Sequence, residues 1–356
     1  MANSPLLSRP GAVAGSGIDE GVAAHYGELN KEQRQLHDGT AVADLSHFEV
    51  VTLRGEDRLS WLNTLSSQAV DKLRPGTSTQ TLLLTVQGRI EFDIRVLAGE
   101  DTLWLLLEPG QAEELVAFLT RMRFMMRVEI TNVSEDYALL GACAPQPTLA
   151  THPVWVDPWP GVTEGGYAYS APEHPGAERP WFLYVVPRDE LQTAVGALPL
   201  AGMLAVEALR IAAWRPRFGM DTDEKTIPHE LDLTRTAVHL DKGCYKGQET
   251  VARVHNIGRP PRRLVFLQLD GSMHTLPALG SEVRIGEKVV GTLTSVASHF
   301  EAGPIGLALV KRNIDPESDV EVVDEQEHYA AKQETIVSPD AGQIAGRFTG
   351  FLRTPR

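Results

Sequence analysis

Short segments with the composition of β-strands occur in two separate parts of this chain, and this distribution limits its fold more than any other feature. The first run spans residues 48–108 and the second spans residues 264–337. Both are rich in Val, Ile, Leu and Thr and are interrupted by Gly, Pro and Asp, which are typical turn residues. Helical patterns lie between them in mixed order, without regular strand–helix alternation. The sequence predicts an α+β fold with a small C-terminal β-barrel.

Apolar residues at helical spacing mark the helices. The segment 56–67 is one candidate, and 187–198 and 203–214 are two more. A fourth, 111–126, places a Met- and Phe-bearing stripe on one face, formed by Leu115, Phe118, Leu119, Met122 and Met125. Such a stripe beside a sheet is much more often core than a cofactor groove, so we expect it to be buried.

The length of 356 residues exceeds what one small core holds, so we expect several domains. The Ser-, Gly- and Pro-rich residues 1–20 are expected to form a flexible tail. Residues 21–145 form an N-terminal α+β region that is expected to interleave with a middle α+β region, 146–262. Within the latter, residues 148–180 are dense in Pro, Gly and Trp and indicate a long irregular connection. Residues 263–356 complete the chain as the barrel domain.

Charge and cysteine content exclude several classes of protein. The chain has 33 basic and 47 acidic residues, a net charge of −14, which opposes broad binding to nucleic acid or anionic membranes. No apolar run approaches the roughly 20 residues that cross a bilayer, and the start lacks the pattern of a signal peptide. Two cysteines, Cys143 and Cys244, cannot build a disulfide scaffold or a self-contained four-thiolate cluster. We therefore expect a cytoplasmic protein with no membrane and no direct nucleic-acid partner.

Common catalytic motifs are missing. The sequence has no Walker loop, HExxH, CxxC or GxSxG, and GSGIDEG near the start does not fit the dinucleotide fingerprint. The eleven histidines show no metal-ligand spacing, so we predict no metal site. Metal catalysis and a serine-hydrolase triad are both poorly supported.

The densest candidate site is LDKGCYKGQETVARVHNIGRPPRR, residues 240–263. Gly243 and Gly247 flank Cys244 and allow tight turns or close approach to a ligand. Lys242 and Lys246 would favour the thiolate if their side chains converge on it.

The rest of the same segment adds polar and basic groups. Gln248 offers an amide and Glu249 a carboxylate, and a basic patch follows, formed by Arg253, His255, Arg259, Arg262 and Arg263. Such a patch suits a substrate that carries carboxylates. The alternative is a surface turn with an incidental cysteine, and the residues alone weigh the two interpretations evenly.

A second candidate is the pair Glu91 and Asp93. In a strand these carboxylates point to one face, where they can orient a polar heterocycle or act as general acid and base. The alternative is that both carboxylates lie on a solvated outer face of the strand. From the strand pattern alone, this alternative is favoured. Cys143, in ALLGACAP, is more simply a small buried residue.

Residues 240–254, LDKGCYKGQETVARV, closely resemble the K-G-C-Y-x-G-Q-E signature of the YgfZ-type folate-binding proteins, which are relatives of the glycine cleavage T-protein (aminomethyltransferase). Segments 42–65, 73–97 and 208–233 and the tail from Arg263 are also similar to the superfamily. The cysteine-bearing octapeptide is specific, whereas the other stretches are shared across the superfamily.

The resemblance implies three domains in a ring around a central folate pocket that binds tetrahydrofolate or a one-carbon derivative. It also implies assembly, insertion or repair of iron–sulfur clusters in client enzymes, including radical enzymes that modify tRNA. The partners would be those clients or cluster-assembly proteins. Cys244 and Asp93 would be the catalytic residues. The implied folate-binding residues are Lys242, Gly243, Tyr245, Gly247, Gln248, Glu249, Arg253 and Arg210.

Two departures from the aminomethyltransferases bear on activity. Those enzymes have a Glu after their L-R-L helix, where this chain has Ala212, so a pterin-anchoring carboxylate is missing. They also carry adjacent carboxylates where this chain has Phe92 before Asp93. We therefore expect a folate-dependent accessory factor for iron–sulfur enzymes. The alternatives are a folate-dependent aminomethyl or one-carbon transferase acting on a small amine, and a scaffold that only contacts proteins.

Overall fold

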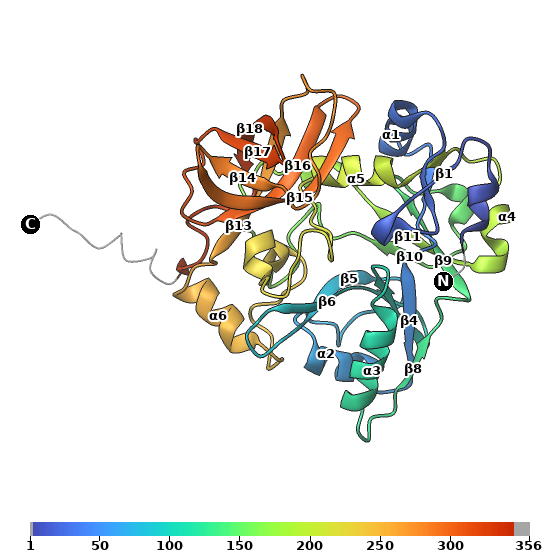
Figure 1. The fold of residues 1–356 in the computed structure, drawn as a ribbon. Coiled ribbons are helices and arrows are strands. Elements are labelled where there is room, and N and C mark those ends of the chain that lie inside the picture. Colours follow the sequence, from blue (N-terminus) through green and yellow to red (C-terminus); the bar gives the residue numbers. More distant parts are fainter. Residues whose placement is uncertain (1–2, 345–356) are drawn as a thin grey trace, which may run out of the picture.

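The computed structural model describes residues 3–344 and has a mixed α/β fold (Figure 1). Within these residues, one antiparallel sheet has the strand order β5-β6-β7-β4-β8. Its strands are β4 (Glu49–Arg54), β5 (Ser78–Leu84), β6 (Ile90–Ala98), β7 (Thr102–Leu107) and β8 (Glu129–Asn132). The first run of strand-like segments therefore forms a single sheet, as its β-branched and leucine-rich composition favours.

A second sheet has the order β10-β11-β9-β3-β12, and its β3–β12 pair is parallel. In sequence, one of its strands precedes the first sheet and the other strands follow it. They are β3 (Val42–Asp44), β9 (Tyr137–Ala142), β10 (Val154–Val156), β11 (Phe182–Pro187) and β12 (Leu200–Ala201). The first sheet is thus inserted between β3 and β9. Short strands β1 (Val13–Ala14) and β2 (Ala23–His25) form a small ribbon of their own.

The C-terminal strands close into a barrel in the order β13-β16-β15-β14-β17-β18, which confirms the predicted β-barrel. The strands are β13 (Arg262–Leu269), β14 (Glu282–Ile285), β15 (Lys288–His299), β16 (Gly303–Lys311), β17 (Val320–Asp324) and β18 (Glu327–Thr335). Closure leaves no unpaired sheet edge, so the barrel needs no covering helix.

Two helices cover the outer face of the first sheet and leave its other face turned toward the middle of the molecule (Figure 1). They are α2 (Arg58–Leu65) and α3 (Ala112–Met122), whose Leu62, Leu115 and Leu119 pack with Val51 and Ile94 of the sheet. The remaining helices are α1 (Leu29–His37), α4 (Leu191–Val195), α5 (Met203–Ala212) and α6 (Gln248–Asn256). Helix α5 lies between the second sheet and barrel strand β15 (Figure 1).

Two expectations about local structure are wrong. Residues 3–20 are not a loose tail, because Leu6 is fully buried and Ser4 caps the short helix Pro5–Ser8 by accepting from the Leu6 backbone. The stripe on α3 does not reach Met125, which is 95% exposed. Helix α3 ends at Met122, and the chain turns through Phe124 at a φ of 46°, so Met125 leaves the helical face.

The long connection between residues 148 and 180 contains little regular structure, as expected. It holds short 3-10 turns at Pro147–Leu149 and Pro175–Glu178, and Trp155 and Trp159 anchor it as two of the largest fully buried side chains. Other such turns are Gly17–Asp19, Arg188–Glu190, Pro228–Leu231 and Leu233–Arg235. No helix among the described residues combines the length and apolar character needed to span a membrane.

Candidate functional site

The signature loop, residues 241–247, leads into α6 and lies against the β5–β6 hairpin. Gly247 has a φ of 85°, and a Cβ there would lie 2.5 Å from the Thr85 carbonyl oxygen and 3.1 Å from the Gly88 Cα. Glycine is therefore required here by both backbone angle and space. The close approach is to the protein's own hairpin. A Cβ on Gly243, by contrast, would meet nothing within 4 Å.

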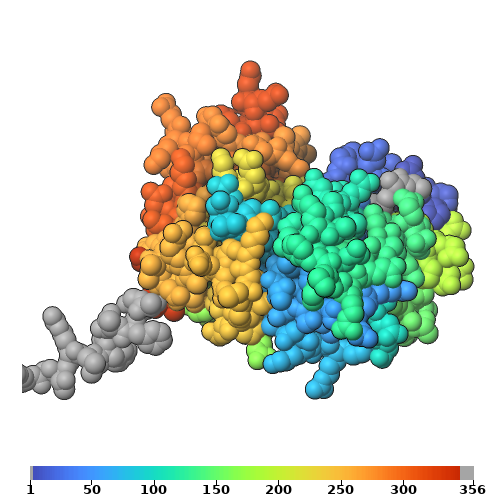
Figure 2. Space-filling view, turned by 90° about the horizontal axis from the view of Figure 1, so that it is seen from below, coloured from blue at the N-terminus to red at the C-terminus, as the bar shows by residue number. Residues whose placement is uncertain are grey.

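Lys242 fastens the signature loop to the end of α2. Its ammonium donates to the backbone oxygens of Asn63 (2.7 Å), Ser66 (2.7 Å) and Gln68 (2.9 Å), and to Asn63 Oδ1 (3.2 Å). Burial lowers the pKa of Lys242 to about 8, and the four oxygens stabilise its charged form. Figure 2 shows the golden surface around α6 beside the blue surface of the α2 region.

The two lysines do not converge on the thiol, so that hypothesis is wrong. Lys242 is held by α2, and Lys246 pairs with Glu91 at 2.9 Å on the neighbouring strand. Each ammonium bonds to oxygen acceptors, and neither forms a hydrogen bond with Cys244 among the described residues.

Further contacts fix the loop on both sides of the cysteine. Tyr245 is buried in the core between α6 and the barrel, and burial raises its pKa. Gln248 Nε2 donates to the Lys242 carbonyl at 3.1 Å and closes the loop. Cys244 itself is exposed, as is Glu249 in the first turn of α6. The octapeptide thus combines anchoring residues with a thiol displayed at the surface.

The predicted basic patch is dispersed, because most of its members have partners in different places. Arg262 binds Asp223 and Glu230, and Arg263 of β13 is fully buried and donates to the Ile314 carbonyl.

The other three members of the patch also lie in different surroundings. Arg259 donates to Gln343, and a ring nitrogen of His255 lies 2.7 Å from the Tyr169 hydroxyl. Arg253 is exposed, and its guanidinium has no partner among residues 3–344. A single cation on α6 remains where five basic groups were expected.

Asp93 lies on the inward face of β6 and is 5% exposed, so the solvated-face alternative is wrong for this residue. Gln80 Nε2 donates to its Oδ1 at 2.6 Å, and the Thr236 hydroxyl donates to Gln80 Oε1 at 2.9 Å. Oδ2 has no hydrogen-bond partner among the described residues. Burial raises the pKa of Asp93, while the positive charges of Arg215 and Arg95 oppose that shift.

Arg210 on α5 is committed to the protein. Nε and Nη2 donate to Glu207 at 2.8 and 2.5 Å, Nη1 donates to Asp221 at 3.0 Å, and Nη2 also donates to the Ser295 hydroxyl at 2.7 Å. Every side-chain nitrogen therefore has an acceptor. This geometry corrects the expected folate contact: Arg210 connects α5 to the barrel.

Sequence reasoning missed a buried network beside Asp93. Arg217 reaches Glu108 (2.8 Å), Glu207 (3.2 Å) and Asp19 (2.7 Å) from its three nitrogens. Its pKa is raised well above the ordinary value because these charges outweigh the burial that lowers it. The sequence did contain a signal for this network, because the two arginines of Arg215-Pro216-Arg217 directly follow an apolar helix. That segment was interpreted only as similar to the superfamily.

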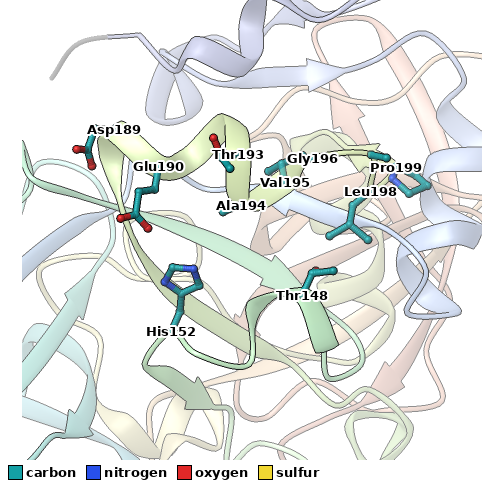
Figure 3. Close-up of a pocket in the computed structure, with 11 residues that line it drawn as sticks. Thr148, His152, Asp189, Glu190, Thr193, Ala194, Val195, Gly196, Leu198 and Pro199 are labelled. Atoms are coloured by element: carbon teal, nitrogen blue, oxygen red, sulfur yellow. The ribbon is translucent and has the colours of Figure 1, made fainter.

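A hollow in the surface lies away from the predicted site residues, between α4 and the turn at residues 147–149. It has a volume of about 580 Å³, and Figure 3 shows His152 and Glu190 at one end and Leu198 and Pro199 at the other. None of the predicted site residues lines it. Within residues 3–344, no group of three or more His, Cys, Asp and Glu side chains is placed to hold a metal ion.

Comparison with known proteins bears on the fold of the chain and on the family of its N-terminal part. Residues 8–148 match the family model of the GCVT N-terminal domain. A crystal structure of glycine cleavage system aminomethyltransferase T from Bartonella henselae superposes with a TM-score of 0.73 at 18% identity, covering 93% of this chain and 95% of that chain. These findings support the T-protein superfamily.

Curated proteins with similar sequences match most of the chain. An Arabidopsis thaliana protein named "Putative transferase At1g60990, chloroplastic" is 24% identical over 322 residues, covering 85% of this chain and 72% of that protein. An aminomethyltransferase of Streptomyces coelicolor is 26% identical over 306 residues, covering 80% and 82%. The T-protein family match ends at residue 148, before the signature loop, so the YgfZ-type assignment stays a prediction.

Proposed function

We propose that this chain binds a reduced folate at the centre of a three-domain ring and transfers a one-carbon unit from a small amine. The observation that carries the proposal is the Asp93 carboxylate, buried and facing inward, with one oxygen held by Gln80 and the other not bonded to the protein. The relatives named aminomethyltransferase support the same reaction class.

The residues present fit a folate in part. The pterin ring carries N–H donors that the Asp93 carboxylate can accept, and Gln80 keeps that carboxylate in one orientation. The glutamate tail carries carboxylates that suit Arg253, the exposed cation on α6. Ala212 supplies no second carboxylate, so Asp93 would provide most of the polar recognition of the pterin.

The protein's part in the chemistry is to position the folate and to hold a proton. A bound reduced folate supplies amine nitrogens that accept a one-carbon unit. Asp93 can take up a proton at Oδ2, because burial raises its pKa and so favours the neutral form. Gln80 and Thr236 are positioning residues, since they fix the carboxylate through Oδ1.

Anaerobic calorimetric titration with tetrahydrofolate tests this proposal. We expect saturable one-to-one binding by the wild type and at least tenfold weaker binding by Asp93→Asn. Glu91→Gln is the matched control, because it removes a half-buried carboxylate two residues away on β6, at the irregularity of the β5–β6 pairing where Glu91 binds Lys246, and it should bind normally. Equal affinities for all three proteins would contradict the role of Asp93. A panel of methylamine and aminomethyl donors then tests turnover, with methylene-folate or formaldehyde as the product measured.

A second candidate function rests on Cys244. The signature loop is anchored by Lys242, Tyr245 and Gly247, yet it exposes the thiol. Displaying a thiol on a fixed loop suits transient contact with an iron–sulfur client enzyme or a cluster-assembly protein in the cytoplasm.

Complementation of a deletion strain separates this second function from the first. Cys244→Ser should fail to restore the activity of iron–sulfur enzymes while still binding tetrahydrofolate. Cys143→Ala is the control, because that cysteine is buried. Full restoration by Cys244→Ser would remove the thiol from the mechanism.

A further inference from the structure

A small, partly open cavity lies between α5, the second sheet and the inward face of the first sheet. Its volume is about 50 Å³, and five arginines and three carboxylates line it together with apolar side chains. The charged residues are Arg95, Arg179, Arg210, Arg215, Arg217, Glu108, Asp157 and Glu207. We call this space the arginine cavity.

The carboxylates of the arginine cavity are already bonded. Glu108 accepts from Arg95 and Arg217, and Glu207 accepts from Arg210 and Arg217. All side-chain nitrogens of Arg210 and Arg217 have acceptors, including Asp221 and Asp19 outside the cavity wall. These two arginines are therefore saturated.

The other three arginines each keep a buried donor without an acceptor. These are Nη1 of Arg95, Nη1 of Arg215 and Nε of Arg179. Arg215 is 6% exposed and has a single ion pair, with Asp157 at 3.1 Å. A guanidinium cannot lose its proton to escape burial, so each donor without a partner is costly.

Arg179 is the least compensated of the three. It lies over the Trp181 ring, 4.5 Å from its centroid, and no carboxylate lies within ion-pair distance of it in the described chain. Burial lowers its pKa, and the charges of Arg215 and Arg210 act in the same direction, while the more distant charge of Asp157 opposes them. The nearby Cys143 thiol offers no counter-charge, because burial raises its pKa and keeps it neutral.

We propose that the arginine cavity binds one small carboxylate anion, of the size of formate or acetate. A carboxylate supplies the acceptor oxygens that Arg95, Arg179 and Arg215 each lack at one nitrogen, together with the negative charge that Arg179 lacks, and it matches guanidinium geometry. Phe48, Trp181 and Leu183 give the cavity apolar walls for the hydrogen or methyl end of such an anion. A volume of 50 Å³ holds about three or four waters and excludes a pterin, so this site is separate from the folate proposal.

Titration of the whole protein with sodium formate, at constant ionic strength and without folate, tests the site. We expect saturable binding and a rise in Tm that the same concentration of chloride does not produce. Arg179→Met should weaken formate binding at least tenfold, and this variant removes the cation without breaking a hydrogen bond of the described structure. Arg127→Met, at an exposed ion pair, is the control and should bind normally.

A second readout does not depend on added ligand. Without formate, Arg179→Met should be at least as stable as the wild type, because it removes a half-buried charge that has no ion-pair partner among the described residues and whose Nε is buried without an acceptor. Saturating formate should raise the Tm of the wild type alone. Failure of the wild type to bind formate, or equal binding by Arg179→Met, would overturn the site.

Further arms of the experiment identify the source of the carboxylate. Formate binding that persists with saturating tetrahydrofolate indicates an independent small anion. Competition by tetrahydrofolate, but not by a tetrahydropterin without the glutamate tail, indicates that a folate carboxylate fills the same site. Either result supports a carboxylate in the cavity, and the first titration stands whether or not folate binds.

Discussion

Arg217 Nε lies 2.8 Å from Glu108 Oε2, and the two side chains are only 4% and 2% exposed. Arg95 shares the same carboxylate, at 2.6 Å from Oε1, so one glutamate compensates two guanidinium groups in the interior. The positive charges lower the pKa of Glu108 despite the burial that raises it. Glu108 follows β7 directly and thereby connects the first sheet to the loop after α5.

Glu108→Gln should destabilise the fold by about 3–5 kcal/mol, the range expected when one partner of a buried ion pair is removed. The loss should appear as a lower urea midpoint with an unchanged denaturant slope. Glu56→Gln, which breaks an exposed pair with Arg127, should leave the midpoint unchanged. Similar midpoints for both variants would show that the buried network contributes little.

Gly247→Ala should cost about 1–3 kcal/mol, because it forces a side chain into a left-handed backbone and against the Thr85 carbonyl. Gly243→Ala is the matched control, since its Cβ meets open space and its φ is not positive. Chemical denaturation of both variants measures the difference. A Gly243→Ala protein as unstable as Gly247→Ala would contradict this account of the loop.

Lys242→Met should loosen the signature loop, since four oxygen contacts with residues 63–68 are lost. We expect hydrogen exchange in residues 241–247 to quicken by tenfold or more, with little change in the barrel. Lys246→Met removes a half-exposed ion pair and should change exchange much less. Unchanged exchange in Lys242→Met would mean that Tyr245 and Gly247 hold the loop without it.

His174 should make the protein sensitive to acid. Its Nδ1 accepts from the Gly176 backbone at 3.0 Å, and burial, aided by Arg235, lowers its pKa from 6.5 to about 4. The unfolded chain therefore binds a proton below pH 6.5 that the folded chain excludes. The stabilising contribution is complete above pH 6.5 and is lost as the pH falls toward 4.

His174→Asn keeps a side-chain acceptor for Gly176 without titrating, so it isolates this effect. Unfolding free energies at pH 7 and pH 4.5 should differ less in the variant than in the wild type, by on the order of 1–2 kcal/mol after allowing for solvent screening. Parallel pH curves for the two proteins would assign the acid sensitivity to other groups.

Local patterns predicted much of the fold. The β-branched runs gave the barrel and the first sheet, because those segments form strands wherever they pack. The N-terminal residues were misjudged, since their Ser, Gly and Pro content resembles a tail and only the tertiary contacts of Leu6 reveal otherwise. The second sheet was not predicted as a unit, because β3, β10 and β12 have only two or three residues each.

The candidate site was predicted in part for a related reason. Asp93 was found as a carboxylate on a strand face, but whether that face is buried depends on partners such as Gln80 and Thr236, 13 and 143 residues away. The basic patch failed because nearness along the chain does not determine where side chains point. Arg262 and Arg263 are adjacent, yet one binds two acids and the other lies inside the protein.

The contacts of Asp221 limit how the molecule can move. One oxygen accepts from Thr294 and Ser295 of β15, and the other accepts from Arg210 of α5 and from the Arg217 backbone. Hinging the barrel away from α5 would separate buried charges and leave donors without partners. The barrel and α5 should therefore turn as one rigid body. A path that admits a ligand to the interior must open along another seam, such as the one between α6 and the β5–β6 hairpin.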